Sequence, residues 1–441
     1  MLLFHLPSRG MNIFKSKRNT LQQIFFARSQ TMESSSNNLS ISSGRRWAIL
    51  ILTSMTCMMI FAALTAYSVS EREIANIFNL SKSVAGLGIT IYAIGLVIGM
   101  IFGGFISDKM GIKNTVLVGM LLLIIPQFII PSAGSFTIIL ILRFLQGLSF
   151  IAWAPFVACV VGWFTGKQKG FATGLYLGVA LAGGMVGGFI TGITLPTLGW
   201  KGTFYILGVI VALFLILWQI VTLTPPRSAA ALETSGRKGG YGVILKMKET
   251  WFLVLIMAGA TWMLYTLLAR VPNYAYDLGY SELKVGTLTT AIGIAYIVAA
   301  LIAGPVSDVL SLKTGLLKGK GICMALGFAV AVIGALLVPW AGATGYGTLF
   351  AVLFIAAFGN SWPQAVYWAV PSEVYDPDVA DAGTGFAGGL GNIPDPIAPT
   401  VILAIAGTGT GWTMAWITCA IASAVGIIAS LLLSASKLKS K

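Results

Sequence analysis

Long apolar runs separated by short polar segments dominate this chain of 441 residues. Most hold roughly 20 or more residues, the length with which a helix crosses a hydrocarbon core of about 30 Å at about 1.5 Å per residue. Lipid offers no partner to an open strand edge, so the runs predict helices. We place twelve spans, at 47–70, 84–107, 114–132, 136–163, 171–195, 203–223, 251–272, 285–307, 321–341, 348–370, 382–406 and 412–434.

Composition supports this pattern, because hydrophobic residues make up 57% of the chain and charged residues only 10%. The mean hydropathy is +0.88, whereas a soluble chain of this length needs a far more charged surface. The predicted fold class is therefore an all-α membrane protein, with twelve transmembrane helices in two pseudo-symmetric six-helix bundles.

The net charge of +14 would fit nucleic-acid binding, but its distribution argues against that partner. Of the 28 Lys and Arg residues, 22 lie on the side that carries both termini and the segment 224–250. The positive-inside rule therefore predicts a multi-pass cell-membrane protein with both termini cytoplasmic. The expected domains are a cytoplasmic tail 1–46, a bundle 47–223, a cytoplasmic linker 224–250, a bundle 251–436 and a cytoplasmic tail 437–441.

The N-terminal tail contains a basic stretch, residues 12–28, with interspersed apolar positions. It is either an interfacial amphipathic helix or a tail upstream of a later start at Met32, and we favour the tail. The sequence leaves open whether residues 1–31 belong to the mature protein. No apolar core with a cleavage site is present, so we expect no signal peptide.

Residues for metal or covalent chemistry are sparse. The four cysteines stand singly in apolar spans, at Cys57, Cys159, Cys323 and Cys419, and His5 is the only histidine. This excludes a histidine proton relay and gives no metal-site or disulfide spacing. No G-x-x-x-x-G-K-[ST] loop occurs, so an ATP-driven permease subunit and a membrane enzyme are both disfavoured. We expect no catalytic residue, no metal and no cofactor.

An internal repeat relates the two halves. Residues 104–113 (GFISDKMGIK) follow the second span and residues 304–308 (GPVSD) follow the eighth, with Asp108 and Asp308 at equivalent places. Ala172-Thr173-Gly174 is echoed by Gly383-Thr384-Gly385. Repeated halves are typical of secondary transporters, in which the substrate binds near the midplane between them.

The run Gly104-x-x-x-Asp108-Lys109-x-Gly111-x-Lys113 resembles the signature loop of the major facilitator superfamily. Arg143-x-x-Gln146-Gly147, the Gly-rich fifth span and Gly199-Trp200-Lys201 are also similar to that family. The resemblance covers roughly 47–436 and is closest to the anion:cation symporter branch. One departure is that acidic residues precede the eleventh span, where that branch usually has a basic one.

The resemblance implies that the loop after the second span latches the cytoplasmic side in one of two alternating states. Gly104 would let a neighbouring helix approach closely, and Asp108 and Lys109 would make the gating contacts. Asp308 is the weaker counterpart, because Ser311 stands where the glycine would be. The alternative is that Lys109 and Lys113 are only topology signals.

Two cations lie inside apolar spans, and a buried cation costs at least about 2.5–3.5 kcal/mol on insertion scales. Arg143 either contacts an anionic substrate or the coupling carboxylate, or forms a structural ion pair or snorkels. For Arg270, near the end of the seventh span, we favour the structural role. Glu71, Arg72 and Glu73 follow the first span, and we expect a solvated loop there rather than an outer gate.

Asp395 is the only acidic residue deep in an apolar span, within Asn392-Ile393-Pro394-Asp395-Pro396. The prolines predict a broken helix, and broken membrane helices line cavities and bind ions. We predict that Asp395 couples transport to a proton or cation gradient. The alternative is a carboxylate locked to Arg143 or capping the broken helix.

Polar and aromatic residues within the spans are candidates to line the substrate cavity: with Arg143, these are Gln146, Trp153, Trp362, Gln364 and Asn392. We therefore expect a monomeric symporter of a small organic or inorganic anion. The alternative is a proton-coupled exporter of amphipathic or drug-like compounds. The fifth span lacks the Gly-Pro pair usual in antiporters of the superfamily, which counts against export.

Overall fold

In a computed structural model, residues 42–164, 167–224, 241–375, 380–407 and 411–436 are described. They form helices and no strand. The predicted tail 437–441 and most of the predicted tail 1–46 and of the linker therefore lie outside the described residues. The N-terminal half consists of α2 (Ser43–Ile77), α3 (Lys82–Met110), α4 (Ile112–Ile129), η1 (Ile130–Ser132), α5 (Phe136–Leu148), η2 (Ser149–Ala152), α6 (Trp153–Trp163), α7 (Lys167–Leu181) and α8 (Gly183–Val221).

The C-terminal half follows the same plan. It consists of α10 (Tyr241–Lys246), α11 (Lys248–Ala269), α12 (Val271–Asp277), α13 (Glu282–Thr314), α14 (Leu316–Thr344), α15 (Tyr346–Tyr367), α16 (Pro371–Val374), α17 (Ala380–Gly391), α18 (Pro394–Ala406) and α19 (Gly411–Ser434).

The described residues contain eleven helices long and apolar enough to cross a membrane, and one of them, Phe171–Val221, is 51 residues long. A straight helix of that length would measure about 76 Å, more than twice the hydrocarbon thickness. The chain reverses inside it at Gly199, whose φ of 62° and ψ of 178° are not helical. This helix therefore makes two crossings, which confirms the predicted twelve.

Several helices are longer than the predicted spans because polar residues extend them. α13 has 33 residues and runs from Glu282 to Thr314, beyond the predicted 285–307 on both sides. α2 continues to Ile77, so the solvated loop expected at Glu71, Arg72 and Glu73 is wrong. Apolar character marks only the part of a helix that crosses lipid and gives no signal for its polar ends.

The predicted break around Asp395 is confirmed. α17 ends at Gly391 and α18 begins at Pro394, with the backbone N–H of Asp395 bonded to the carbonyl of Asn392 at 3.0 Å. Proline fits the first helical turn, where its missing N–H would have no intrahelical partner. Asp395 therefore stands in the first turn of a new helix, next to its positive dipole end.

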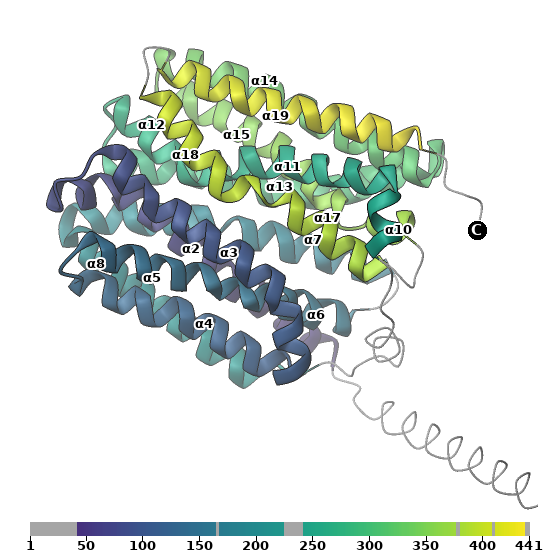
Figure 1. Cartoon of the computed structure of the whole chain (residues 1–441), viewed down its shortest axis with the longest axis horizontal. Coiled ribbons are helices and arrows are strands. Elements are labelled where there is room, and N and C mark those ends of the chain that lie inside the picture. Colours follow the sequence, from purple (N-terminus) through teal and green to yellow (C-terminus); the bar gives the residue numbers. More distant parts are fainter. Residues whose placement is uncertain (1–41, 165–166, 225–240, 376–379, 408–410, 437–441) are drawn as a thin grey trace, which may run out of the picture.

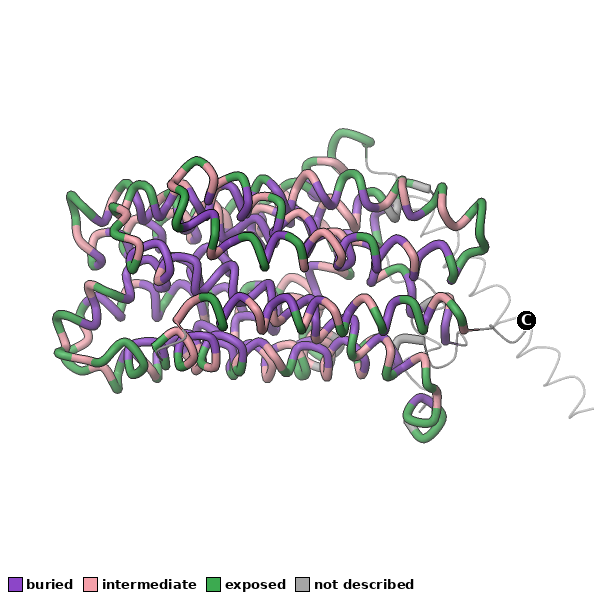
Figure 2. The backbone as a smooth tube through the Cα atoms, turned by 90° about the horizontal axis from the view of Figure 1, so that it is seen from above, coloured by how far each residue is buried: buried purple, intermediate pink, exposed green. Residues whose placement is uncertain are grey.

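The two halves lie side by side as two layers of helices, purple to teal and green to yellow in Figure 1. We call the end of the bundle that carries residues 78–81 and 270–281 the distal end, and the opposite end, where α2 begins and α19 finishes, the terminal end (Figure 1). Buried residues lie along the inward faces of the helices, and exposed residues cover the outer faces and connections (Figure 2).

The repeat is visible in the backbone. Asn79 and Gly279 both have positive φ after the first membrane crossing of their half, at 51° and 82°. Gly111 and Gly315 both stand at the end of the repeated motif helix, with φ of 80° and 100°. The glycine turn missing at Ser311 is thus present one helical turn later, at Gly315, because α13 is four residues longer than α3.

Close helix packing in the N-terminal half depends on glycines of α3. Side chains at Gly95, Gly99 and Gly103 would strike the backbone of α5 and η2. Gly104, which we expected to permit such an approach, has no atom within 4 Å of the place a Cβ would occupy. The close approach is therefore one residue earlier in this state, and a gating role for Gly104 stays a prediction about another state.

Candidate functional site

A pocket lies between the two halves, with about 440 Å³ of space unoccupied by protein atoms, its open part included. The cavity proper measures about 40 Å³, which is room for water but not for an organic anion in this state. The N-terminal half contributes mainly apolar and aromatic walls, and the C-terminal half contributes the polar groups. The lining residues are Phe61, Leu96, Met100, Phe150, Trp153, Leu177, Leu181, Met257, Thr261, Leu264, Tyr265, Gln364, Trp368, Asn392 and Asp395.

Asp395 is the acidic residue of this pocket. Its side chain is 2% exposed, and its Oδ1 has no hydrogen-bond partner. Thr261 and Tyr265 of α11 line the same wall, and the Thr261 hydroxyl also donates to the carbonyl of Gly391 at 2.9 Å, at the helix break. A carboxyl oxygen that is buried and unpartnered is costly, which favours a group that binds a proton or cation during function.

Four of the predicted site residues meet in this pocket: Trp153, Gln364, Asn392 and Asp395. Three others lie elsewhere. Trp362 donates its indole N–H to Cys323 at 3.2 Å within the C-terminal half. Arg143 and Gln146 are buried inside the N-terminal half and do not line the pocket.

Arg143 is held by aromatic rings and carbonyls. Its guanidinium lies 4.4 Å from the ring centres of both Tyr67 and Tyr92. It donates to Gln146 Oε1 at 2.8 Å and to the carbonyl of Gly88 at 3.2 Å. Gln146 in turn donates to Gln127 at 2.6 Å. Within the part of the chain that the structure describes, Arg143 makes no bond to Asp395. The alternative in which Arg143 locks that carboxylate is therefore not seen in this state.

The network gives a testable structural role to Arg143. Lysine cannot reproduce a flat guanidinium between two rings with several donors, so Arg143→Lys should lower protein stability by about 1–3 kcal/mol. The measurement is the melting temperature of the purified protein in detergent. Arg72→Lys is the matched control, because Arg72 is exposed and lies 5.7 Å from the ring centre of Tyr276. Equal melting of the two variants would contradict the role.

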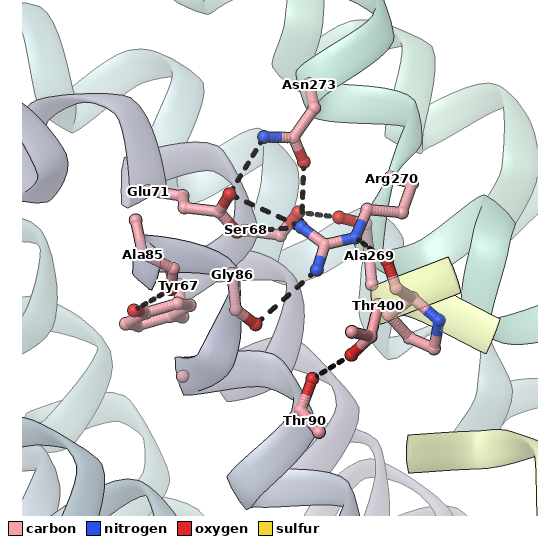
Figure 3. Close-up of polar contacts among 12 residues, drawn as sticks. Tyr67, Ser68, Glu71, Ala85, Gly86, Thr90, Ala269, Arg270, Asn273 and Thr400 are labelled. Carbon is pink, nitrogen blue, oxygen red and sulfur yellow. Dashed lines mark hydrogen bonds and ion pairs between the residues drawn. The ribbon is translucent and has the colours of Figure 1, made fainter. Parts of the chain in front are cut away.

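At the distal end, a buried ion pair joins the halves (Figure 3). Arg270 Nη1 lies 3.0 Å from Glu71 Oε2, with side-chain exposures of 0% and 2%. Asn273 donates to Glu71 Oε1 at 3.0 Å. The structural ion pair favoured for Arg270 is present, but its partner from the other half was missed. The sequence did contain a signal for this pairing. Arg270 is an intramembrane cation and Glu71 an acidic residue, and each lies near the distal end of the first membrane crossing of its half.

Further polar contacts join the halves beside this pair. Lys82 and Asp277 form an ion pair at 2.6 Å, Tyr276 donates to the carbonyl of Val69 at 2.9 Å, and Ser68 donates to the carbonyl of Ala269. Thr90 and Thr400 are also hydrogen-bonded (Figure 3). We call these contacts, together with Glu71, Arg270 and Asn273, the distal latch.

The latch lies on one side of the pocket. On α2 the pocket residue Phe61 precedes Ser68, and on α11 Thr261 precedes Ala269. On α3, which runs in the opposite direction, the pocket residues Leu96 and Met100 follow the latch residue Thr90. Each of these three helices thus has its latch residues nearer the distal end, so the described structure is closed at that end.

The signature loop lies at the terminal end. The backbone of Asp108 is in the last turn of α3, but its side chain is outside the described residues, and Lys109 is exposed. Asp308 is exposed on α13. Lys113 donates to the carbonyl of Gln219 at 2.8 Å, and Gln219 donates back to the carbonyl of Lys113 at 3.0 Å. Lys113 therefore joins the loop to the end of α8 and is more than a topology signal.

Two repeated six-helix halves with a pocket between them, lined by residues of both, define a polytopic membrane transporter. The chain belongs to the Major Facilitator Superfamily, whose family model matches residues 47–399 and 250–441. The fold agrees, because a solved bacterial homologue of the human lysosomal transporter Spinster, inward-facing and unoccupied, superimposes with a TM-score of 0.68 at 16% identity, covering 89% of this chain and 98% of that one.

Named relatives are transporters. A hexuronate transporter of Bacillus subtilis is 27% identical over 76% of this chain and 82% of its own length. A probable sulfoacetate transporter of Cupriavidus necator is 24% identical over 78% of this chain and 83% of its own. An efflux pump of Gibberella moniliformis is 28% identical over a shorter stretch, 42% of this chain and 31% of its own. The resemblance to anion-transporting members is thereby confirmed.

Proposed function

We propose that this protein is a secondary transporter of a small organic anion, driven by a proton or cation gradient through Asp395. The observation that carries the proposal is the buried, unpartnered carboxyl oxygen of Asp395 in the wall of the pocket. The names of the hexuronate and sulfoacetate transporters support an anionic substrate.

The charges in the pocket give a physical reason for coupling. Among the residues that line it, Asp395 is the charged one, and no Lys or Arg lines it. An ionised Asp395 would repel an anion inside a poorly screened cavity. Once a proton or cation neutralises the carboxylate, the repulsion is removed and the anion can bind. The two solutes would then cross together, which is symport.

The distal latch supports alternating access. It closes one end of the pocket with polar contacts that involve α2 and α3 from one half and α11, α12 and α18 from the other. Rocking of the two halves would break these contacts and expose the pocket distally. The distribution of Lys and Arg predicts cytoplasmic termini. In that orientation the distal end faces the outside, and the described state is closed to it.

A second candidate rests on the apolar wall of the same pocket. Phe61, Phe150 and Trp153 line it together with Asp395, and a carboxylate among aromatic rings suits an amphipathic cation. Protonation of Asp395 would release such a cation, which is the chemistry of a proton-exchanging exporter. The relationship to a fungal efflux pump is compatible with this candidate.

Uptake into proteoliposomes separates the two. The panel contains glucuronate, tartrate and sulfoacetate, with glucose and a quaternary amine as uncharged and cationic members. We expect an inward proton or sodium gradient to drive accumulation of at least one anion, and neither glucose nor the amine to accumulate. Movement of the amine alone, against an opposing proton flux, would favour the exporter and overturn the anion proposal.

A further inference from the structure

The arginine of the distal latch makes two sets of contacts that belong to different halves. Within its own half, Arg270 Nε donates to the carbonyl of Pro399 at 2.8 Å and Nη1 contacts Asn273 Oδ1 at 3.3 Å. Toward the other half, Nη1 donates to Glu71 and Nη2 donates to the carbonyl of Gly86 at 3.4 Å. Figure 3 shows the guanidinium between these two sets.

Opening the distal end separates the two sets. Glu71 on α2 and Gly86 on α3 move away with the N-terminal half, whereas Pro399 and Asn273 stay with Arg270. The guanidinium therefore keeps Pro399 at Nε and Asn273 at Nη1, and loses Glu71 from Nη1 and the carbonyl of Gly86 from Nη2. A guanidinium edge with two free N–H groups is the geometry that binds a carboxylate in a bidentate manner.

The closed structure already shows a carboxylate on this edge. The Glu71 carboxylate accepts from Arg270 Nη1 at 3.0 Å and from Asn273 Nδ2 at 3.0 Å. Both donors belong to the C-terminal half, so that half alone builds a carboxylate site, in which the N-terminal half places its own glutamate. When the halves part, this site is vacated and faces the solution on the distal side.

We propose that Arg270 and Asn273 form the first binding site for the substrate's carboxylate from the distal side, and that Glu71 is its intramolecular competitor. A substrate anion occupies the two donors in the open form. Glu71 takes them back as the distal end closes, and the substrate passes on to the pocket beside Asp395. This inference rests on the proposed anion transport and names the site that first receives the anion.

Location of the site explains a feature of the pocket. The pocket holds an acidic residue and no cationic residue among those that line it, so it has no group to attract an anion from solution. Arg270 directly follows α11 at its distal end, and Thr261 and Tyr265 of α11 line the pocket. An anion held at Arg270 is thus about one and a half to two and a half helical turns from the residues of α11 that line the pocket.

The test compares a charge swap with single and double neutral variants, using glucuronate as the probe and glucose as its uncharged counterpart. Uptake from the distal side and binding to the purified protein are both measured. We expect Arg270→Gln to weaken glucuronate binding at least tenfold, and Glu71→Gln to strengthen it severalfold by removing the competitor. The swap E71R/R270E and the pair E71Q/R270Q should both remain as weak as Arg270→Gln.

A latch without a binding role gives a different pattern. The swapped pair would restore the ion pair, and the double neutral variant would leave no unpaired charge, so both would regain glucuronate binding close to that of the wild type. That result overturns the site. A wild-type protein that moves none of the panel's anions overturns the proposed function itself. Melting temperatures identify a variant that is merely unfolded. In that case Asn273→Ala, which removes only the second donor, replaces it. We expect Asn273→Ala to weaken glucuronate binding severalfold, and unchanged binding would contradict the site.

Discussion

Replacing Asp395 by Asn should abolish gradient-driven accumulation while leaving exchange of substrate across the membrane intact. Asparagine has nearly the same shape as a protonated aspartic acid but cannot release a proton. For one proton carried with each anion, setting the charge on the anion aside, a pH difference of one unit supplies about 1.4 kcal/mol, which is a tenfold accumulation. The accumulation ratio should therefore fall from about ten to about one.

The measurement is uptake of labelled substrate into proteoliposomes under an imposed gradient, followed by counterflow without a gradient. Glu249→Gln is the matched control, since Glu249 is an acid of the same half in the first turn of α11 and does not line the pocket. A D395N protein that still accumulates substrate as the wild type does would remove Asp395 from the coupling mechanism. Loss of counterflow as well would place Asp395 in substrate binding.

Replacing Gly188 by Val should block transport by preventing closure of the distal end. Gly188 lies on α8 where α8 packs against α13 of the other half, and a side chain there would overlap the hydroxyl of Thr289. Gly192 lies on the same face, and a Cβ placed on it would be 3.0 Å from Gly286 Cα. Overpacking of this kind costs about 1–3 kcal/mol, which shifts the ratio of closed to open forms about 5- to 150-fold.

Two measurements check this expectation. Uptake should fall by a similar factor, and a cysteine placed at Val69, which is fully buried at the latch, should become reactive toward a membrane-impermeant maleimide in a background without native cysteines. Adding Thr289→Gly removes the atoms that the new side chain strikes and should restore part of the activity. Gly134→Val, at a place with no atom within 4 Å, is the neutral control. Unchanged labelling at position 69 would show that the packing of α8 against α13 does not control the distal end.

The sequence predicted the architecture well because the membrane imposes a strong constraint. A long apolar run must become a helix, and the repeat spacing of Asp108 and Asp308 relates the halves. The break at Pro394 was also predictable from local chemistry. Helix ends were less predictable, because polar residues such as Glu71 continue α2 without any apolar signal.

The site was only partly predictable, and the reason is long-range pairing. Trp153, Gln364, Asn392 and Asp395 share one pocket, as expected for polar and aromatic residues in spans. Whether a buried cation faces the pocket or its own bundle depends on neighbours that one sequence does not reveal. Arg143 faces Tyr67 and Tyr92, and Arg270 faces Glu71, 199 residues away in the chain.

The position of the latch has a consequence for the kinetics of the two membrane faces. The ion pairs and hydrogen bonds of the distal latch join the halves on the distal side of the pocket. A solute arriving distally therefore finds only the fraction of carriers whose latch is open, and its apparent dissociation constant is the intrinsic one divided by that fraction. With about 1% open, a hundredfold higher concentration half-saturates the distal face than the terminal face. A solute concentration that saturates flux from the terminal face would then leave flux from the distal face still rising in proportion to concentration.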